Sequence, residues 1–169
     1  MEVNSKTFSA LISALNNKPS IGLVAPKLVY GSGALQKSTD VFPTITHKIY
    51  RYFFLKKIEN EENLKKQADL PQHIDYAISA FWLFKKELLE SIGLLDEKFF
   101  YAPEDVDFCL RIWQQGYKIL YVPQTYAIHY AQEISRGLKF NKAMREHIKG
   151  LIYLFFKHRY LFRRPKFNP

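Results

Sequence analysis

The sequence feature that most constrains the fold is a run of aromatic residues and acids that leads directly into an amphipathic segment. This run, FFYAPEDVDFCLRIWQQGY, covers residues 99–117. Pro103 suits the first position of a helix, where a missing N–H costs nothing, and Gly116 suits the left-handed position just past a helix end. The pattern therefore predicts a helix from Pro103 to Gln115.

Apolar residues recur in this segment at spacings of three and four, which is typical of a helix face that packs on a core. They are Val106, Cys109, Leu110 and Trp113. Asp107 and Arg111 are four residues apart, and we expect them to form an ion pair on another face. Because Cys109 is the only cysteine, the sequence excludes an internal disulfide and a cysteine-rich metal site.

The carboxylates of Glu104 and Asp105, in the expected first turn, allow two interpretations. A helix N-terminus favours negative charge, so these acids could simply stabilise the helix. However, five of the residues 99–108 are Phe, Tyr or Pro, and an apolar rim around polar groups is typical of a ligand cleft. Crowded carboxylates in such a rim can hold one pKa high enough to accept a proton near neutral pH. The chemistry expected from this second interpretation is general-base activation of a hydroxyl.

The rest of the chain alternates between strand-like and helix-like segments, which predicts an α/β fold with a mixed sheet flanked by helices. With 169 residues, of which 47% are hydrophobic, the chain is long enough for one domain with a substantial core. We expect this domain over residues 1–135 and a basic, amphipathic helical tail over 136–169. The helices are expected at Lys6–Asn16 and Lys85–Ile92, and the strands at Ile21–Tyr30, Ala34–Ser38, Ile74–Phe84, Tyr117–Val122 and Thr125–Tyr130.

Two prolines and one charged run qualify this pattern. Pro26 in the first long strand indicates a sheet edge or a bulge, and Pro123 is expected to end the strand before it. Acids and bases alternate at helical spacing over residues 56–66. That run fits either a solvated helix or a mobile lid, and the sequence does not decide between them.

The net charge of +9 lies entirely in the tail. Residues 1–135 hold 15 basic and 15 acidic side chains, whereas residues 136–169 hold 10 basic side chains and one acid. The apolar face of the expected tail helix consists of Met144, Ile148, Leu151, Ile152 and Phe155. The bases available to an anionic partner are Lys142, Arg145, Lys149, Lys157, Arg159, Arg163 and Arg164.

Three fates of this tail remain open. It could pack on the domain, lie on an anionic membrane surface, or bind nucleic acid phosphates. We rank docking with membrane contact first. Nucleic acid is last, because the aromatic residues lie among aliphatic ones on a helix instead of being displayed on a sheet.

Several spaced motifs carry a resemblance to a known family. They are Asp96-Glu97-x-Phe99-Phe100, Glu104-Asp105-x-Asp107-Phe108-x-Leu110-Arg111, Gly116-Tyr117, Val122-Pro123 and His129. In this order they resemble the C-terminal half of family 2 glycosyltransferases of the GT-A fold, and in particular the rhamnosyltransferase-like members that build bacterial surface polysaccharides. The resemblance covers residues 21–135.

The resemblance implies an inverting transferase that moves a sugar from a nucleotide-diphospho-sugar to a saccharide or lipid-linked acceptor. Asp105 would be the general base, a role worth roughly a hundred- to ten-thousand-fold in rate, and Glu104 would bind the acceptor or tune Asp105. The acceptor-binding residues would be Trp82, Phe100, Tyr101 and Asp107. His129 would help to bind a divalent ion, Mg²⁺ or Mn²⁺, on the donor diphosphate, although a strand-end histidine satisfied by hydrogen bonds is the simpler interpretation.

The family's donor-binding half, with its Asp-x-Asp motif, has no counterpart before Ile21. We therefore expect a C-terminal fragment or a truncated gene product that binds no metal or nucleotide sugar tightly and is inactive alone. The alternative is a non-catalytic basic module that contacts membrane or nucleic acid or forms a homodimer. No apolar run is long enough to span a bilayer, and we expect a cytoplasmic protein with peripheral contact to the inner face of the membrane.

Overall fold

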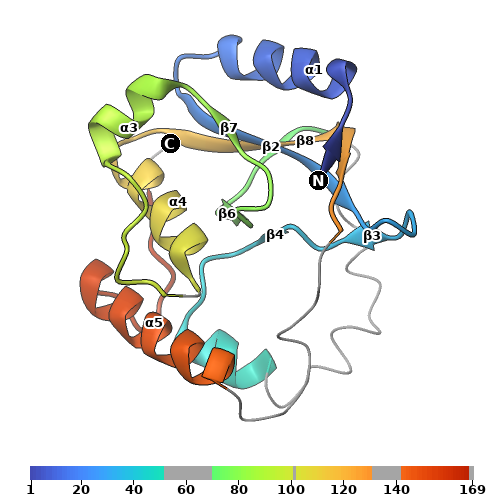
Figure 1. The fold of residues 1–169 in the computed structure, drawn as a ribbon. Helices are drawn as coiled ribbons and strands as arrows, with labels where there is room; N and C mark the ends of the chain where they lie inside the picture. The colour runs from blue at the N-terminus through green and yellow to red at the C-terminus, as the bar shows by residue number, and fades with distance from the viewer. Residues whose placement is uncertain (52–69, 101, 131–141, 168–169) are drawn as a thin grey trace.

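The computed structural model describes residues 1–51, 70–100, 102–130 and 142–167, and shows a mixed sheet with helices on both faces (Figure 1). The main sheet contains β1 (Glu2–Val3), β2 (Ile21–Val29), β3 (Leu35–Gln36), β5 (Gln72–His73), β7 (Leu83–Phe84) and β8 (Lys118–Ile128). A separate pair consists of β4 (Thr39–Asp40) and β6 (Tyr76–Ala77). The helices are α1 (Ser5–Asn16), α3 (Lys86–Ile92), α4 (Glu104–Gln114) and α5 (Lys142–His158), and residues 45–51 are also helical. The predicted fold class is confirmed.

The centre of the main sheet is the parallel pair of β2 and β8. Pro26 pairs with Val122, but the next residue, Lys27, pairs with Tyr126, so residues 123–125 bulge out of the ladder. The bulge needs no N–H from Pro123, and the strand continues to Ile128 instead of ending as predicted. Pro26 therefore marks a bulge, and the edge-strand alternative is wrong because β2 has paired neighbours on both sides.

Each face of the sheet has its own core. On one face Leu11 and Leu15 of α1 pack with Val24 and Val122, and Asn4 caps this helix by accepting a hydrogen bond from the Thr7 N–H at 2.7 Å. On the other face α4 buries most of its length, with the residues Val106, Phe108, Cys109, Leu110 and Ile112 in the core. The predicted apolar stripe of this helix is confirmed, and it is wider than its spacing indicated.

The predicted long strand over 74–84 is wrong. The chain instead pairs briefly with β4 through β6, turns, and then pairs with β2 through β7. The indole N–H of Trp82 donates to the carbonyl of Ala77 at 3.2 Å and so closes the turn. A continuous apolar run cannot distinguish one strand from two short strands joined in this way.

The tail helix α5 packs against α4, and its buried face overlaps only in part with the one predicted (Figure 1). Phe155 is buried and Leu151 packs against the core as predicted, but Gly150 and Leu154 are buried as well, whereas Ile148 and Ile152 are exposed. The reason is Gly150: a Cβ there would lie 2.1 Å from the carbonyl oxygen of Ala102. This close approach turns the glycine side of the helix inward. None of the described helices is long and apolar enough to cross a membrane.

Candidate functional site

The first turn of α4 presents the two acids singled out in the sequence. The helix begins at Glu104, one residue later than predicted, and it ends at Gln114, with Gly116 in the left-handed conformation at φ +81°. Its first turn, at the lower end of the helix in Figure 1, begins beside Gly150 of α5. Ser79, in the turn between β6 and β7, contacts Glu104, and the charge of Lys48, from the 45–51 segment, acts on Asp105. Glu104 and Asp105 are both partly buried there.

Asp105 is tuned to exchange a proton near neutral pH. Burial, followed by repulsion from Glu104, raises the pKa of Asp105 to about 7. The N–H of Val106, which donates to Oδ1 at 2.8 Å, and the charge of Lys48 oppose this rise without overcoming it. A carboxylate with this pKa can accept a proton from a hydroxyl and release it again at neutral pH.

Glu104 offers an unused hydrogen-bond acceptor beside Asp105. One carboxylate oxygen, Oε1, accepts a hydrogen bond from the Ser79 hydroxyl at 3.2 Å. The other oxygen, Oε2, is buried, and no group among the described residues donates to it. Leaving a buried acceptor unpaired costs stability, so such an atom fits a site that is completed by a ligand hydroxyl.

An open apolar groove lies next to Ser79. It has a volume of about 660 Å³, and its lining includes Ser79, Trp82, Phe84, Leu94 and Phe108. Trp82 stacks on Phe108 with ring centroids 5.2 Å apart, which fixes the indole at the groove wall. Aromatic walls with a few polar groups at one end are typical of small-molecule sites.

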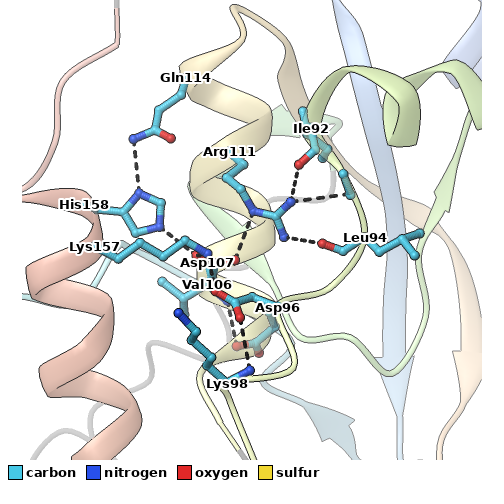
Figure 2. Close-up of polar contacts among 12 residues, drawn as sticks. Ile92, Leu94, Asp96, Lys98, Val106, Asp107, Arg111, Gln114, Lys157 and His158 are labelled. Carbon is cyan, nitrogen blue, oxygen red and sulfur yellow. Dashed lines mark hydrogen bonds and ion pairs between the residues drawn. The ribbon is translucent and has the colours of Figure 1, made fainter.

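Asp107 lies on α4 about one helical turn after Glu104 and has no exposed surface. Its Oδ2 accepts from Arg111 at 3.0 Å, and its Oδ1 contacts both Lys157 at 2.7 Å and His158 at 2.8 Å (Figure 2). Burial alone would raise the pKa of Asp107, but the hydrogen bonds from His158 and Lys157 and the charge of Arg111 hold it below its ordinary value. The predicted pair of Asp107 and Arg111 is confirmed, and these contacts favour a structural role for Asp107 over the predicted contact with an acceptor.

The same network ties down the loop before α4. Lys157 bridges from Asp107 to Asp96, whose Oδ2 lies 2.7 Å from the ammonium. Arg111 donates to the carbonyls of Ile92 and, at 2.9 Å, Leu94 (Figure 2). Residues from α3, α4, α5 and the loop between α3 and α4 are therefore held by one cluster of charges.

His129 follows the last residue of β8 and is partly buried. Its Nδ1 lies 3.0 Å from Oε1 of Gln36 on β3. Because a carbonyl oxygen only accepts, Nδ1 is the donor in this contact, which leaves Nε2 as the ring nitrogen that a ligand could use. The described part of the chain contains no group of three or more His, Cys, Asp or Glu residues that could hold a metal ion. These residues alone do not form a metal site, and His129 would be a single ligand.

The remaining predicted site residues are dispersed. Phe100 is 75% exposed, and the Nζ of Lys142 lies over its ring, 5.6 Å from the centroid. Tyr101 lies outside the described residues. The predicted anion-contacting bases are exposed, with the exception of Lys157, which is held by Asp96 and Asp107: Lys142, Arg145, Lys149, Arg159, Arg163 and Arg164.

Four polar residues that surround these groups were not predicted from the sequence: Gln36, Lys48, Ser79 and His147. Burial lowers the pKa of Lys48, and burial, followed by the charge of Lys48, lowers the pKa of His147 to about 4. Gln36 and Ser79 act as partners of His129 and Glu104. No local motif marks any of them, because each comes from an element distant in sequence from α4.

Comparison of the structure with solved structures gives the class of fold. The chain is similar to GalNAc-T7, crystallised with UDP, GalNAc and Mn²⁺, with a TM-score of 0.56 and 16% sequence identity. The similarity covers 92% of this chain and 29% of that one. The fold is therefore that of a GT-A glycosyltransferase, as the sequence motifs predicted.

Comparison of sequences points to one group within this class. The chain is 35% identical over 77 residues to the rhamnosyltransferase WbbL of Escherichia coli (strain K12). The aligned part is 46% of this chain and 29% of that protein, so the match spans less than a third of the relative's length. No protein-family model matches the chain. The predicted resemblance to a rhamnosyltransferase-like glycosyltransferase is confirmed by these two similarities.

Proposed function

We propose that the chain is the acceptor-side part of an inverting glycosyltransferase in which Asp105 is the general base. The observation that carries the proposal is the pair of acids at the start of α4. The pKa of Asp105 is raised to about 7, and the adjacent Glu104 has a buried oxygen without a donor. Together they form a site that can hold a hydroxyl and take its proton.

The reaction is a single displacement. The acceptor hydroxyl oxygen forms a bond to the anomeric carbon of the donor sugar, the bond from that carbon to the diphosphate breaks, and the nucleoside diphosphate leaves with the electron pair. The hydroxyl proton passes to Asp105. Attack opposite the leaving group inverts the anomeric configuration.

The residues described here would act on the acceptor. Glu104 Oε2 would accept a hydrogen bond from a second acceptor hydroxyl, and the Ser79 hydroxyl holds the other carboxylate oxygen in place. The Trp82 wall of the groove would stack on a sugar face. A saccharide or a lipid-linked saccharide meets these requirements, since both combine hydroxyls with apolar ring faces.

The donor would be a nucleotide-diphospho-sugar. Support comes from the similarity to a rhamnosyltransferase and from the UDP and Mn²⁺ bound in the GalNAc-T7 crystals. A divalent ion, Mg²⁺ or Mn²⁺, would offset the charge of the leaving diphosphate, with His129 Nε2 as one ligand. The other ligands would come from outside the described residues.

The test is sugar transfer by the longest protein that the gene encodes, with Asp105→Asn compared with Glu90→Gln. Glu90 is an exposed acid on the neighbouring α3. We expect Asp105→Asn to lower kcat by roughly a hundred- to ten-thousand-fold, with KM for the acceptor little changed. Glu90→Gln should match the wild type. Unchanged kcat in Asp105→Asn would remove this residue from the mechanism.

A non-catalytic basic binding module is the second candidate, and the exposed bases of the tail favour it. The two candidates differ in what Asp105 does. In a binding module, Asp105→Asn would leave every measured activity intact, and removal of the tail bases would abolish the only function.

A further inference from the structure

We propose that the outward face of α5 is a membrane-docking surface that inserts apolar side chains between anionic lipid headgroups. The surface consists of Lys142, Arg145, Ile148, Lys149, Ile152, Phe156 and Arg159, which we call the α5 strip. These residues recur at spacings of three and four and therefore lie along one side of the helix. The four bases, Ile148 and Ile152 already stand out in the sequence, whereas Phe156 joins the strip because of its exposure in the structure.

The apolar members of the strip are unusually exposed for their size. Phe156 is 77% exposed, Ile152 is 52% exposed and Ile148 is 39% exposed. Beyond the end of the helix Leu161 and Phe162 are exposed as well. Water-exposed apolar groups in a row of this kind mark a surface that is completed by a partner.

The orientation of α5 is fixed from the inward side, so the strip cannot turn into the core. Gly150 is buried against Ala102, and no larger residue would fit there. Lys157 and His158 are both held by the buried carboxylate of Asp107. Figure 1 shows α5 at the edge of the molecule opposite α1.

The charge of the strip identifies the partner. Within the described residues Lys142, Arg145 and Arg159 have no carboxylate at ion-pair distance, and the strip contains no acid. Lys149 alone pairs, at 2.8 Å, with the neighbouring Glu146. Apolar side chains flanked by bases are the pattern of a helix that lies in the interface of an anionic membrane.

Two other occupants fit this pattern less well. A second copy of the chain, related by a twofold axis, would bring the bases of one strip against those of the other. Nucleic acid phosphates would pair with the bases but would leave Ile152 and Phe156 exposed. An anionic lipid surface satisfies the bases and the apolar side chains together.

The strip also lies close to the candidate site. Lys142, its first residue, stacks on the exposed ring of Phe100, and Gly150 touches the residue that precedes Pro103 at the start of α4. Docking through the strip would bring the acids at this helix start near the lipid surface, where a lipid-linked acceptor would be presented. This last step depends on the proposed function, whereas the membrane contact does not.

The experiment is co-sedimentation of the full 169-residue chain with vesicles of phosphatidylglycerol and phosphatidylcholine, and with vesicles of phosphatidylcholine alone. We expect binding to the anionic vesicles only, weakened by salt. Ile152→Ser combined with Phe156→Ser should lower the partition coefficient more than tenfold. Arg145→Gln combined with Arg159→Gln should lower it about twenty-five-fold, since each base near an anionic surface contributes roughly fivefold.

The matched controls lie on the opposite face of the molecule. Ile12→Ser on α1 removes an isoleucine that is 48% exposed, and Lys6→Gln on the same helix removes an exposed base. Both should bind as the wild type does, and all variants should keep the wild-type circular dichroism spectrum because the changed side chains are exposed.

Three results would overturn the proposal. The first is that the wild type does not bind anionic vesicles, or that both double variants bind them as tightly as the wild type does. The second is a dimer in sedimentation equilibrium that Phe156→Ser dissociates, which would assign the strip to self-association. The third is that the chain binds DNA as tightly as it binds vesicles, in a salt-sensitive way, and that Ile152→Ser combined with Phe156→Ser leaves this DNA binding intact. None of these measurements involves a sugar donor, so each outcome leaves the assignment of Asp105 standing.

Discussion

The Nε2 atom of His158 lies 2.8 Å from Oδ1 of Asp107, and this contact joins the last turn of α5 to the first turns of α4 (Figure 2). Asp107 follows the proposed base by only two residues. The C-terminal helix therefore helps to hold the acids of the candidate site, although fifty residues of sequence separate the two segments.

Replacing Asp107 by asparagine should lower the free energy of unfolding by about 3–5 kcal/mol, because the charges of Arg111 and Lys157 lose a buried partner. Urea denaturation measures the change. The control is Glu146→Gln, which breaks the exposed pair with Lys149 and should cost less than about 1 kcal/mol. Equal losses for the two variants would show that the buried network does not stabilise the fold.

The carboxylate of Asp107 should also make the free energy of unfolding depend on pH in the acid range. The pKa of Asp107 is held below its ordinary value in the native state, so the unfolded chain takes up a proton first as the pH falls. The contribution is complete above about pH 4, the ordinary pKa of aspartate, and is lost as the pH falls through the native pKa. Urea midpoints between pH 5 and pH 2 should fall steeply for the wild type and less steeply for Asp107→Asn.

Asp105 should have the opposite effect on stability. Its pKa is raised to about 7, so between about pH 4 and pH 7 the native state binds a proton that the unfolded chain has released. Stability from this group is full below about pH 4 and declines as the pH rises to 7. Asp105→Asn should remove this decline and unfold at higher urea than the wild type at pH 8. If the urea midpoint fell by the same amount between pH 5 and pH 8 in the wild type and in Asp105→Asn, that would contradict the raised pKa.

The charge of Glu104 contributes to that pKa, second to burial. Glu104→Gln keeps the shape of the side chain and removes the repulsion, so the pKa of Asp105 should fall. Carboxyl ¹³C chemical shifts measured against pH would give the pKa of Asp105 in the wild type and in the variant. The variant Glu97→Gln, an acid outside the first turn of α4, serves as the control and should leave the midpoint of Asp105 in place.

Gly150 should resist substitution more than its position in a helix indicates. Alanine ordinarily stabilises a helix interior relative to glycine by up to about 1 kcal/mol. Here a Cβ would meet the carbonyl oxygen of Ala102 at 2.1 Å, so Gly150→Ala should destabilise the protein by roughly 1–3 kcal/mol. Lys149→Ala, at the exposed neighbouring position, should change stability by less than that. A stabilised Gly150→Ala variant would show that α5 does not pack this closely.

The elements that the sequence predicted well are those with caps and a clear period. The glycine at the end of α4 and the apolar spacing of that helix each reflect a local rule, and the structure follows them. The strand errors have a different origin. Pro123 was expected to end a strand, and only the register of the partner strand shows that the residue is placed in a bulge.

The candidate site divides in the same way. Glu104 and Asp105 stand out in the sequence because they are adjacent to each other and to an aromatic run. Ser79, Gln36 and Lys48 could not be found, because each meets its partner only through the fold. The tail helix was predicted only in part for a similar reason: helical periodicity identified its apolar residues, but the close packing of Gly150 decides which of them face the core.

The contacts of Lys157 and His158 with Asp107 have a consequence for truncated relatives of this chain that lack α5. A stop codon placed after β8 would leave every motif of the glycosyltransferase resemblance in place, since the last of them is His129. The shortened product would nevertheless carry a buried carboxylate that has lost Lys157 and His158, at the turn that bears the acids. Motif conservation in a shortened homologue would therefore overstate its competence, and the presence of the downstream lysine and histidine is the better sign that the site is still held together.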